Sequence, residues 1–232
     1  RQWFLHGGHV AAYAVIRACP YGKPGDRGGA TMFLIDMDAP GLRVVRHIDT
    51  LDEGFFGGHC ELEFHDVFVT PDAVLGEVDR GFENAQVRLA PARLTHCMRW
   101  LGIARHAQES AVTRAAEREL FGSRLGDLGM VQAMVADSEI DLAASRLLIW
   151  QACAELDQGR SAAQSSSIAK TFVAEAVGRV VDRALQVCGS LGVSGDTLLS
   201  RYHREVRPFR IYDGPSETHR WAIAKRRLRQ SA

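Results

Sequence analysis

The sequence predicts an α+β protein in which an antiparallel β domain is followed by an antiparallel four-helix bundle. Residues 9–78 contain short apolar segments separated by turn residues, which is typical of strands. After Gly81 the apolar residues instead recur every three or four positions, as they do on helices. Because the expected helices are long and their connections short, an antiparallel bundle is favoured. We therefore expect two domains, residues 1–79 and 80–232.

The expected strands follow one another at short spacing. Apolar segments at residues 10–19, 31–37 and 42–48 are separated by turn-rich stretches, including residues 20–29. In residues 60–65, apolar and polar side chains alternate, which is the pattern of a half-buried strand. The short connections predict antiparallel pairing.

The expected helices have broad apolar faces. The clearest example runs from Ile168 to Leu185, where two sets of apolar residues each recur every fourth position. Similar patterns cover residues 82–117, 130–157 and 216–229, and glycines at 126–129 and 189–195 predict breaks between helices.

Composition excludes several classes of function. The chain has 232 residues, of which 46% are hydrophobic and 24% charged, which indicates a globular protein. Because 28 basic residues balance 28 acidic residues, no net charge favours nucleic acid or an anionic membrane. No apolar run approaches 18 residues, so we expect no transmembrane helix. The first residues lack a signal-peptide pattern and a starting Met, so we expect the chain to begin inside a longer protein.

Cysteine and histidine patterns give no support for a disulfide framework or a metal site. The five cysteines are odd in number, widely spaced and without a CxxC pair, and the nine histidines contain no HxxxH pair. We therefore expect a reducing compartment, either a bacterial cytoplasm or an organelle matrix.

The segment from Arg204 to Glu217 contains the principal catalytic candidate. Asp213 lies between Tyr212 and Gly214 at an expected break between two helices. A carboxylate held on such a break can meet a substrate carbon at a fixed angle, as proton abstraction requires. The alternative is an ordinary turn in which Asp213 accepts local backbone hydrogen bonds.

Several separately spaced motifs resemble those of one enzyme family. Residues 118–122 resemble an Arg-x-x-Phe-Gly signature, and residues 186–192 resemble a Gln-x-x-Gly-Gly-x-Gly turn. Trp3 with the following Gly7 and Gly8 resembles a Trp-Ile-Thr-Asn-Gly segment. These motifs belong to the acyl-CoA dehydrogenases, and the chain resembles the C-terminal two thirds of that family. Residues 88–99 are most similar to the subfamily numbered 10 and 11, whose base is also an Asp.

The resemblance implies FAD-dependent α,β-dehydrogenation of an acyl-CoA thioester to the trans-2-enoyl-CoA, in fatty-acid or related acyl catabolism. Asp213 would remove the α-proton, and the β-hydrogen would leave as hydride to the flavin. The resemblance also implies an electron-transfer flavoprotein, or a similar acceptor, as partner. Because two of the motifs serve the FAD of a second subunit in this family, it implies a homodimer or homotetramer.

The resemblance assigns further residues to cofactor and substrate. Cofactor contacts would come from Trp3, Arg118, Phe121, Gln186, Gly189, Pro215 and Glu217. Substrate contacts would come from Arg93, Gly214 and Lys225, the last toward the CoA moiety.

Taken alone, these residues have plainer interpretations. Arg118 and Lys225 also fit solvated helix faces, and Gly189 fits a helix cap. Trp3 and Phe121 also fit core aromatic positions, and Arg93 fits a salt bridge.

Three features depart from the family pattern. Leu5 stands where the family usually has a Thr or Ser that hydrogen-bonds the flavin, and Ser190 replaces a glycine. The N-terminal helical domain of the family has no counterpart in this sequence.

Ala92 excludes a base on the helix that carries Arg93, where some members place it. Two alternatives stay open: a flavin oxidase on the same fold, similar to nitroalkane oxidase, and a non-catalytic truncated paralogue.

Overall fold

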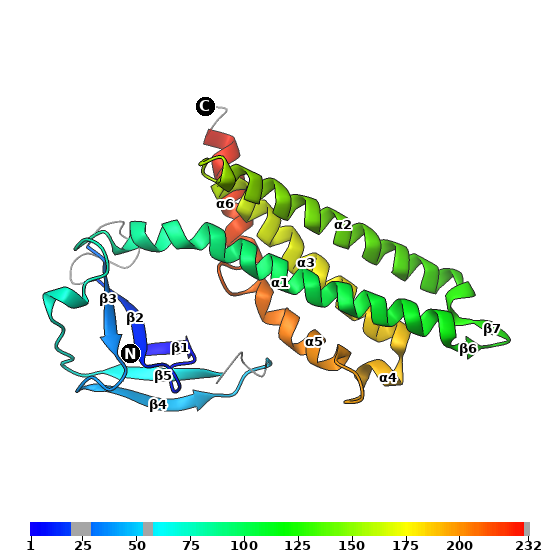
Figure 1. Ribbon diagram of the computed structural model, residues 1–232, viewed down its shortest axis with the longest axis horizontal. Helices are drawn as coiled ribbons and strands as arrows, with labels where there is room; N and C mark the ends of the chain where they lie inside the picture. Colours follow the sequence, from blue (N-terminus) through cyan, green and yellow to red (C-terminus); the bar gives the residue numbers. More distant parts are fainter. Residues whose placement is uncertain (20–28, 53–57, 230–232) are drawn as a thin grey trace. The chain divides into compact units, whose positions relative to one another are not determined.

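The computed structural model describes residues 1–19, 29–52 and 58–229, which form two compact units (Figure 1). The first unit comprises residues 1–89 and the second begins at Ala90. The division falls within helix α1 (Gly81–Glu117), one residue before Pro91, whose ring removes a helical hydrogen bond. The helix that starts at the predicted domain boundary therefore contributes to both units.

The first unit contains two antiparallel sheets. One sheet has the order β1-β5-β4, and the other pairs β2 with β3. The strands are β1 (Gln2–His6), β2 (Tyr13–Ala18), β3 (Thr31–Asp36), β4 (Leu42–Ile48) and β5 (His59–Phe64), followed by the 3₁₀ turn η1 (Pro71–Ala73). The predicted antiparallel pairing is observed in all of them. The predicted turn at 20–29 lies almost entirely outside the described residues.

Strand β5 lies between β1 and β4 in its sheet, and its side chains are buried on both faces. Cys60 and Leu62 are fully buried, as the alternation predicts. Glu61, expected on the polar face, is also buried because Arg1 and Arg46 both donate hydrogen bonds to its carboxylate. These bonds, that of Arg1 foremost, lower the pKa of Glu61.

Strand β1 was not predicted from the sequence. Its pairing with β5 is interrupted between Gln2 and Leu5, and Phe4 has a positive φ of 69°. Such an irregularity breaks the alternation on which strand prediction depends. The Phe4 ring stacks on His59 at 4.1 Å between ring centroids, which holds this irregular strand against β5.

The second unit is a helical bundle, and the α+β class is confirmed. The residues predicted as helices correspond to α1, α2, α3 and α6. The helices after α1 are α2 (Gly129–Asp157), α3 (Ala163–Cys188), α4 (Ser190–Val193), α5 (Leu199–Val206) and α6 (Ser216–Arg229). Between them lie the hairpin β6 (Glu119–Leu120) and β7 (Ser123–Arg124), and the 3₁₀ turns η2 (Leu125–Asp127) and η3 (Arg207–Arg210).

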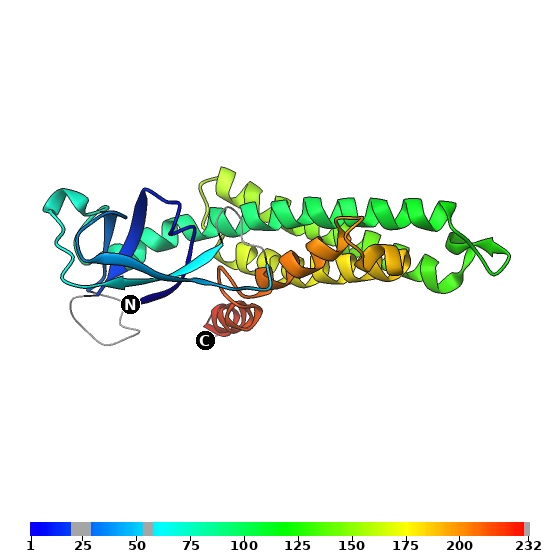
Figure 2. The same cartoon turned by 90° about the horizontal axis from the view of Figure 1, so that it is seen from below.

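Helix α3 is the centre of this bundle. Its buried valines pack against α1 and α2, and α5 runs alongside it in both views (Figures 1 and 2). Asp141 on α2 is buried and accepts hydrogen bonds from Arg179 at 2.6 Å and Arg183 at 2.9 Å, both on α3. This ion cluster fixes α2 to α3. In the described part of the chain, no helix is both long and apolar enough to span a membrane.

Candidate active site

The loop between η3 and α6 holds Asp213 in a left-handed backbone conformation. Its φ is 53°, and that of Gly214 is 99°. Asp tolerates this region better than most residues, and glycine adopts it without steric cost. A Cβ at Gly214 would lie only 2.8 Å from Nε2 of His219. The Asp-Gly pair is therefore required by the loop itself.

Three helices hold the carbonyl groups of this loop. The Asp213 carbonyl accepts hydrogen bonds from Arg93 Nε on α1 at 3.2 Å and from His219 Nε2 on α6 at 3.1 Å. The Gly214 carbonyl accepts a hydrogen bond from Lys170 Nζ on α3 at 2.6 Å. Because both carbonyls are held from different elements, the backbone that carries the Asp213 side chain has a fixed position.

The Asp213 carboxylate is partly enclosed. Its Oδ2 atom is buried and lies 3.2 Å from His96 Nε2, but accepts no hydrogen bond of acceptable geometry from the described residues. The turn interpretation expects local backbone bonds to this carboxylate, and Oδ2 receives none. An acceptor atom in this state can take up a proton from a bound molecule.

Aromatic and cationic side chains surround Asp213. The Tyr212 hydroxyl accepts hydrogen bonds from Trp100 Nε1 and from Arg99 at 3.0 Å. Its ring meets His96 edge-on at 5.0 Å between centroids. Burial raises the pKa of Tyr212, so its hydroxyl stays neutral. The loop is thus anchored on both sides of Asp213.

Lys170 is a functional candidate that sequence analysis missed. Its side chain is fully buried, and Nζ lies 5.3 Å from the centre of the Phe209 ring. Burial lowers the pKa of Lys170 to about 8 and raises the pKa of the Cys97 thiol to about 12. A signal was available, because Lys170 falls in line with Val173 and Val177 on the apolar face of its helix.

His219 and His96 were also assigned no role from the sequence. Burial lowers the pKa of His219, which favours a neutral ring that can donate from Nε2 to the Asp213 carbonyl. His96 lies three residues after Arg93 and four before Trp100. That spacing places all three on one helix face and could have identified His96.

A second group of predicted residues lies at the opposite end of α3. Phe121 and Gly122 form the turn of the β6–β7 hairpin, with φ values of 55° and 82°. Two successive positive φ values are the mark of a tight type I′ hairpin turn. Phe121 is 90% exposed, and Arg118, just before the hairpin, is exposed as well. The core-aromatic interpretation of Phe121 does not describe this chain.

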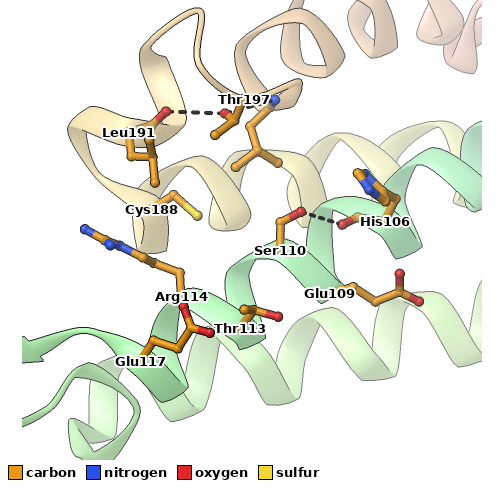
Figure 3. Close-up of a pocket in the computed structure, with 10 residues that line it drawn as sticks. His106, Glu109, Ser110, Thr113, Arg114, Glu117, Cys188, Leu191 and Thr197 are labelled. Atoms are coloured by element: carbon orange, nitrogen blue, oxygen red, sulfur yellow. Dashed lines mark hydrogen bonds between the residues drawn. The ribbon is translucent and has the colours of Figure 1, made fainter.

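Gln186 and Gly189 lie at the exposed end of α3. Gly189 has a φ of 62°, and a Cβ there would meet nothing within 4 Å, so backbone conformation alone requires glycine. A pocket of about 420 Å³ opens here, between the ends of α1 and α3 (Figure 3). Arg114 and Cys188 are among the residues that form its walls.

The two groups are well separated. Lys170 marks one group and Gln186 the other, and both lie on α3, about 24 Å apart at the rise of an α-helix. The structure therefore brings Asp213, Gly214 and Arg93 together. It places the Arg118 and Gln186 motifs elsewhere on the same unit.

The remaining predicted residues are distributed as follows. Pro215 and Glu217 are exposed at the start of α6, and Lys225 Nζ lies 4.3 Å from the centre of the Trp221 ring on the same helix. Trp3 belongs to β1 of the first unit and is 60% exposed. Leu5 packs beside Gly8, where a Cβ would approach its side chain to 3.0 Å.

Comparison with known proteins identifies acyl-CoA dehydrogenases among the relatives of this chain. A sequence model described as "Acyl-CoA dehydrogenase, C-terminal domain" matches residues 79–228. A probable acyl-CoA dehydrogenase, FadE2, of Mycobacterium tuberculosis is 38% identical over 85% of this chain and 49% of its own length. Acyl-CoA dehydrogenase family member 11 of Homo sapiens is 39% identical over 87% of this chain and 26% of its own length. The chain thus spans at most about half of these curated relatives.

Solved structures agree with this result. A putative acyl-CoA dehydrogenase from Mycobacterium abscessus matches with a TM-score of 0.91 and 33% identity, over 99% of this chain and 58% of that one. Butyryl-CoA dehydrogenase from Megasphaera elsdenii matches with a TM-score of 0.90 and 26% identity, over 98% and 59%. A chain from a study of the electron transferring flavoprotein of Acidaminococcus fermentans matches with a TM-score of 0.91 and 28% identity, over 98% and 60%.

Proposed function

Because the chain belongs to the acyl-CoA dehydrogenase family, we propose that it carries the catalytic base and part of the flavin site of an FAD-dependent acyl-CoA dehydrogenase. The product would be the trans-2-enoyl-CoA, in fatty-acid or related acyl catabolism. One observation carries the proposal: the buried Oδ2 of Asp213 accepts no hydrogen bond from the described residues, while its loop is held by three helices.

Asp213 takes the α-proton of the acyl thioester in this proposal. Arg93, Lys170 and His219 do not touch the proton; they fix the carbonyls of residues 213 and 214 and so position the carboxylate. His96, 3.2 Å from Oδ2, limits the directions from which substrate can approach. Positioning of this kind is a large part of the rate enhancement in proton abstraction.

The exposed end of the bundle fits a dinucleotide. Arg118 supplies a cation suited to a pyrophosphate, and Phe121 supplies an exposed aromatic face. Gln186 supplies an amide, and the positive φ of Gly189 turns the chain without a side chain in the way. Bound FAD supplies the hydride acceptor of the reaction.

The separation of the two groups supports a homo-oligomer. The base lies about 24 Å along α3 from the Gln186 motif, so one end of the unit can serve the flavin of its own active site and the other the flavin of a second subunit. We propose a homodimer or homotetramer, with an electron-transfer flavoprotein or a similar protein as electron acceptor. A reducing cytoplasm or organelle matrix is the proposed location.

The test uses the full-length polypeptide that the gene encodes. After loading with FAD, it is mixed anaerobically with acyl-CoAs of several chain lengths while the flavin absorbance is followed. We expect bleaching within the mixing experiment, and reoxidation by ferricenium rather than by oxygen. Rapid reoxidation by oxygen would identify the oxidase alternative. A protein that stays colourless with excess FAD would support the non-catalytic alternative and refute the proposal.

A further inference from the structure

His96 connects a buried carboxylate oxygen of Asp213 with solvent. Its Nε2 atom lies 3.2 Å from Oδ2 of Asp213, and the two atoms form no hydrogen bond of acceptable geometry. Oδ2 itself is buried, whereas the His96 side chain is 32% exposed. One imidazole ring therefore lies beside the proposed base and also reaches water.

A proton that arrives on Oδ2 needs a carrier to leave it. In the proposed reaction Asp213 becomes a neutral carboxylic acid in each turnover, and it must lose that proton before the next. The Asp213 side chain is 19% exposed, and an acyl group in position for proton abstraction would cover that exposed part. The loop cannot turn Oδ2 into water without breaking the hydrogen bonds that Arg93, Lys170 and His219 donate to its carbonyls.

Other ionisable groups at this loop are poorly suited to carry the proton. Arg93, Lys170 and His219 each direct a nitrogen to a backbone carbonyl of the loop. The Tyr212 hydroxyl already accepts hydrogen bonds from two donors on α1. Burial raises the pKa of the Cys97 thiol to about 12, so this thiol stays protonated and has no use as a base.

We infer that His96 carries the α-proton from Asp213 to water, an inference that rests on the proposed dehydrogenation. A neutral ring protonated at Nδ1 presents the lone pair of Nε2 to Oδ2. Two acceptors that face one another form no hydrogen bond, and none is observed. A charged ring would instead donate from Nε2 to the carboxylate. The geometry thus fits a ring that waits to receive a proton from Asp213.

Each transfer conserves protons and electron pairs. The α C–H bond breaks, its electron pair stays on the acyl group, and an O–H bond forms at Oδ2. Rotation about the C–O bond turns this O–H toward Nε2 of His96. The O–H bond then breaks as an N–H bond forms at Nε2, which leaves Asp213 ionised again. The imidazolium releases its Nδ1 proton to water, and exchange with water restores the first tautomer.

The test follows bleaching and proton release in one experiment. The full-length polypeptide, loaded with FAD, is mixed anaerobically with acyl-CoA in weak buffer that contains a pH indicator. The parent should release one proton per flavin at the rate of bleaching. His96→Gln keeps a polar side chain but has no basic nitrogen. It should bleach within about threefold of the parent rate and release its proton about tenfold more slowly.

Two further variants complete this experiment. Free imidazole should restore fast proton release to His96→Ala, because it can occupy the space that the ring leaves. His203→Gln is the matched control and should behave as the parent. The ring of His203 is exposed on α5, with Nε2 3.6 Å from the carboxylate of Asp182, and takes no part in the loop.

A second measurement removes hydride transfer. With the flavin reduced beforehand, the acyl-CoA is incubated with enzyme in D₂O, and deuterium at the α-carbon is measured by mass spectrometry. The parent passes the abstracted proton to solvent and should incorporate deuterium. His96→Gln returns the same proton to the α-carbon, so it should incorporate deuterium about tenfold more slowly.

The outcomes separate the relay from the proposed function. Proton release that lags behind bleaching in the parent would overturn the relay, and this measurement needs no variant to fold. Equal proton release and deuterium incorporation in His96→Gln and the parent would overturn it as well, with Asp213 retained as the base. Loss of bleaching in His96→Gln would show that His96 acts on the abstraction itself, which also contradicts the relay. A parent that never bleaches would overturn the proposed function and the relay together.

Discussion

The two ends of helix α3 are built on opposite principles. Near Lys170, cations and aromatic rings are buried, and hydrogen bonds from three helices converge on one loop. Near Gln186, the predicted ligand contacts are exposed, and the guanidinium of Arg118 makes no ion pair with any residue that the structure describes. The end near Lys170 is held by contacts within the chain, whereas the side chains of Arg118, Phe121 and Gln186 are exposed.

The difference between the two ends predicts which properties a mutation should change at each. At the buried end, loss of a side chain leaves a carbonyl or a cation without its partner, so stability and turnover change together. At the exposed end, loss of a side chain should change binding alone.

Asp213→Asn should reduce turnover about 10²- to 10⁴-fold, the usual contribution of a general base. Asparagine tolerates the left-handed φ of 53° as well as aspartate does, so the loop should keep its shape. Flavin content should hardly change, because the base does not retain the cofactor. The measurement is the rate of flavin bleaching by acyl-CoA, in enzyme and variant matched for FAD.

Asp213→Glu is the companion variant. It retains a carboxylate and should keep some activity, but glutamate adopts a positive φ less readily, at a cost of about 1 kcal/mol. An Asp213→Asn variant that bleaches as fast as the parent enzyme would mean that another group takes the proton.

Lys170→Met should remove a pH dependence of stability. Burial lowers the pKa of Lys170 to about 8, below that of a lysine in the unfolded chain. Between pH 8 and about pH 10.4, the unfolded chain therefore binds more protons at this position than the folded chain does. The free energy of unfolding of the parent, relative to the variant, should rise by about 3 kcal/mol across that window.

Urea unfolding at several pH values measures the free energy of unfolding of the parent and of Lys170→Met. The other titrating groups contribute equally to both proteins, so the difference between the two reports Lys170. The variant also leaves the Gly214 carbonyl without its donor, so turnover at pH 7 should fall about tenfold. Parallel stability curves for the parent and Lys170→Met would contradict the prediction.

Sequence alone predicted the elements whose pattern is repetitive. The long helices and the antiparallel strands β2 to β5 each repeat one period along their residues. The position of Asp213 between two helices was predicted as well. Strand β1 escaped prediction because a positive φ at Phe4 breaks its alternation. Helix α5 (Leu199–Val206) was missed because it is short and rich in charge.

The candidate site was predictable only in part, for a physical reason. A motif identifies residues that are expected to contact a ligand, such as Asp213 and Arg118. It does not identify the residues that hold the motif, because their partners are distant in sequence. Lys170 reaches a carbonyl of residue 214, and Arg99 reaches the hydroxyl of Tyr212, across separations that no local pattern records.

Arg118→Ala should weaken FAD binding by about 10- to 100-fold, the scale of a lost charge-assisted contact. Its stability should not change, because the guanidinium is exposed. Fluorescence titration of the complete polypeptide with FAD measures the affinity. Arg124→Ala, an exposed arginine on the other strand of the same hairpin, is the control and should bind FAD normally. Equal affinities for both variants would favour the solvated-arginine interpretation.

Phe121→Ala should have the smallest effect on stability, about 0.5 kcal/mol or less. Its ring is 90% exposed at a hairpin turn, so truncation removes almost no buried area.

Phe209 offers the matched comparison, because it is fully buried against Trp100 and Lys170 at the other end of the unit. Phe209→Ala should cost about 3 to 5 kcal/mol, the usual price of removing a core aromatic. Urea unfolding of the two variants measures both values under one condition. Similar losses in the two would show that Phe121 is a structural aromatic, and that the two ends of α3 do not differ as described. A silent Phe121→Ala that nonetheless binds FAD less tightly would show that this residue acts only on the cofactor.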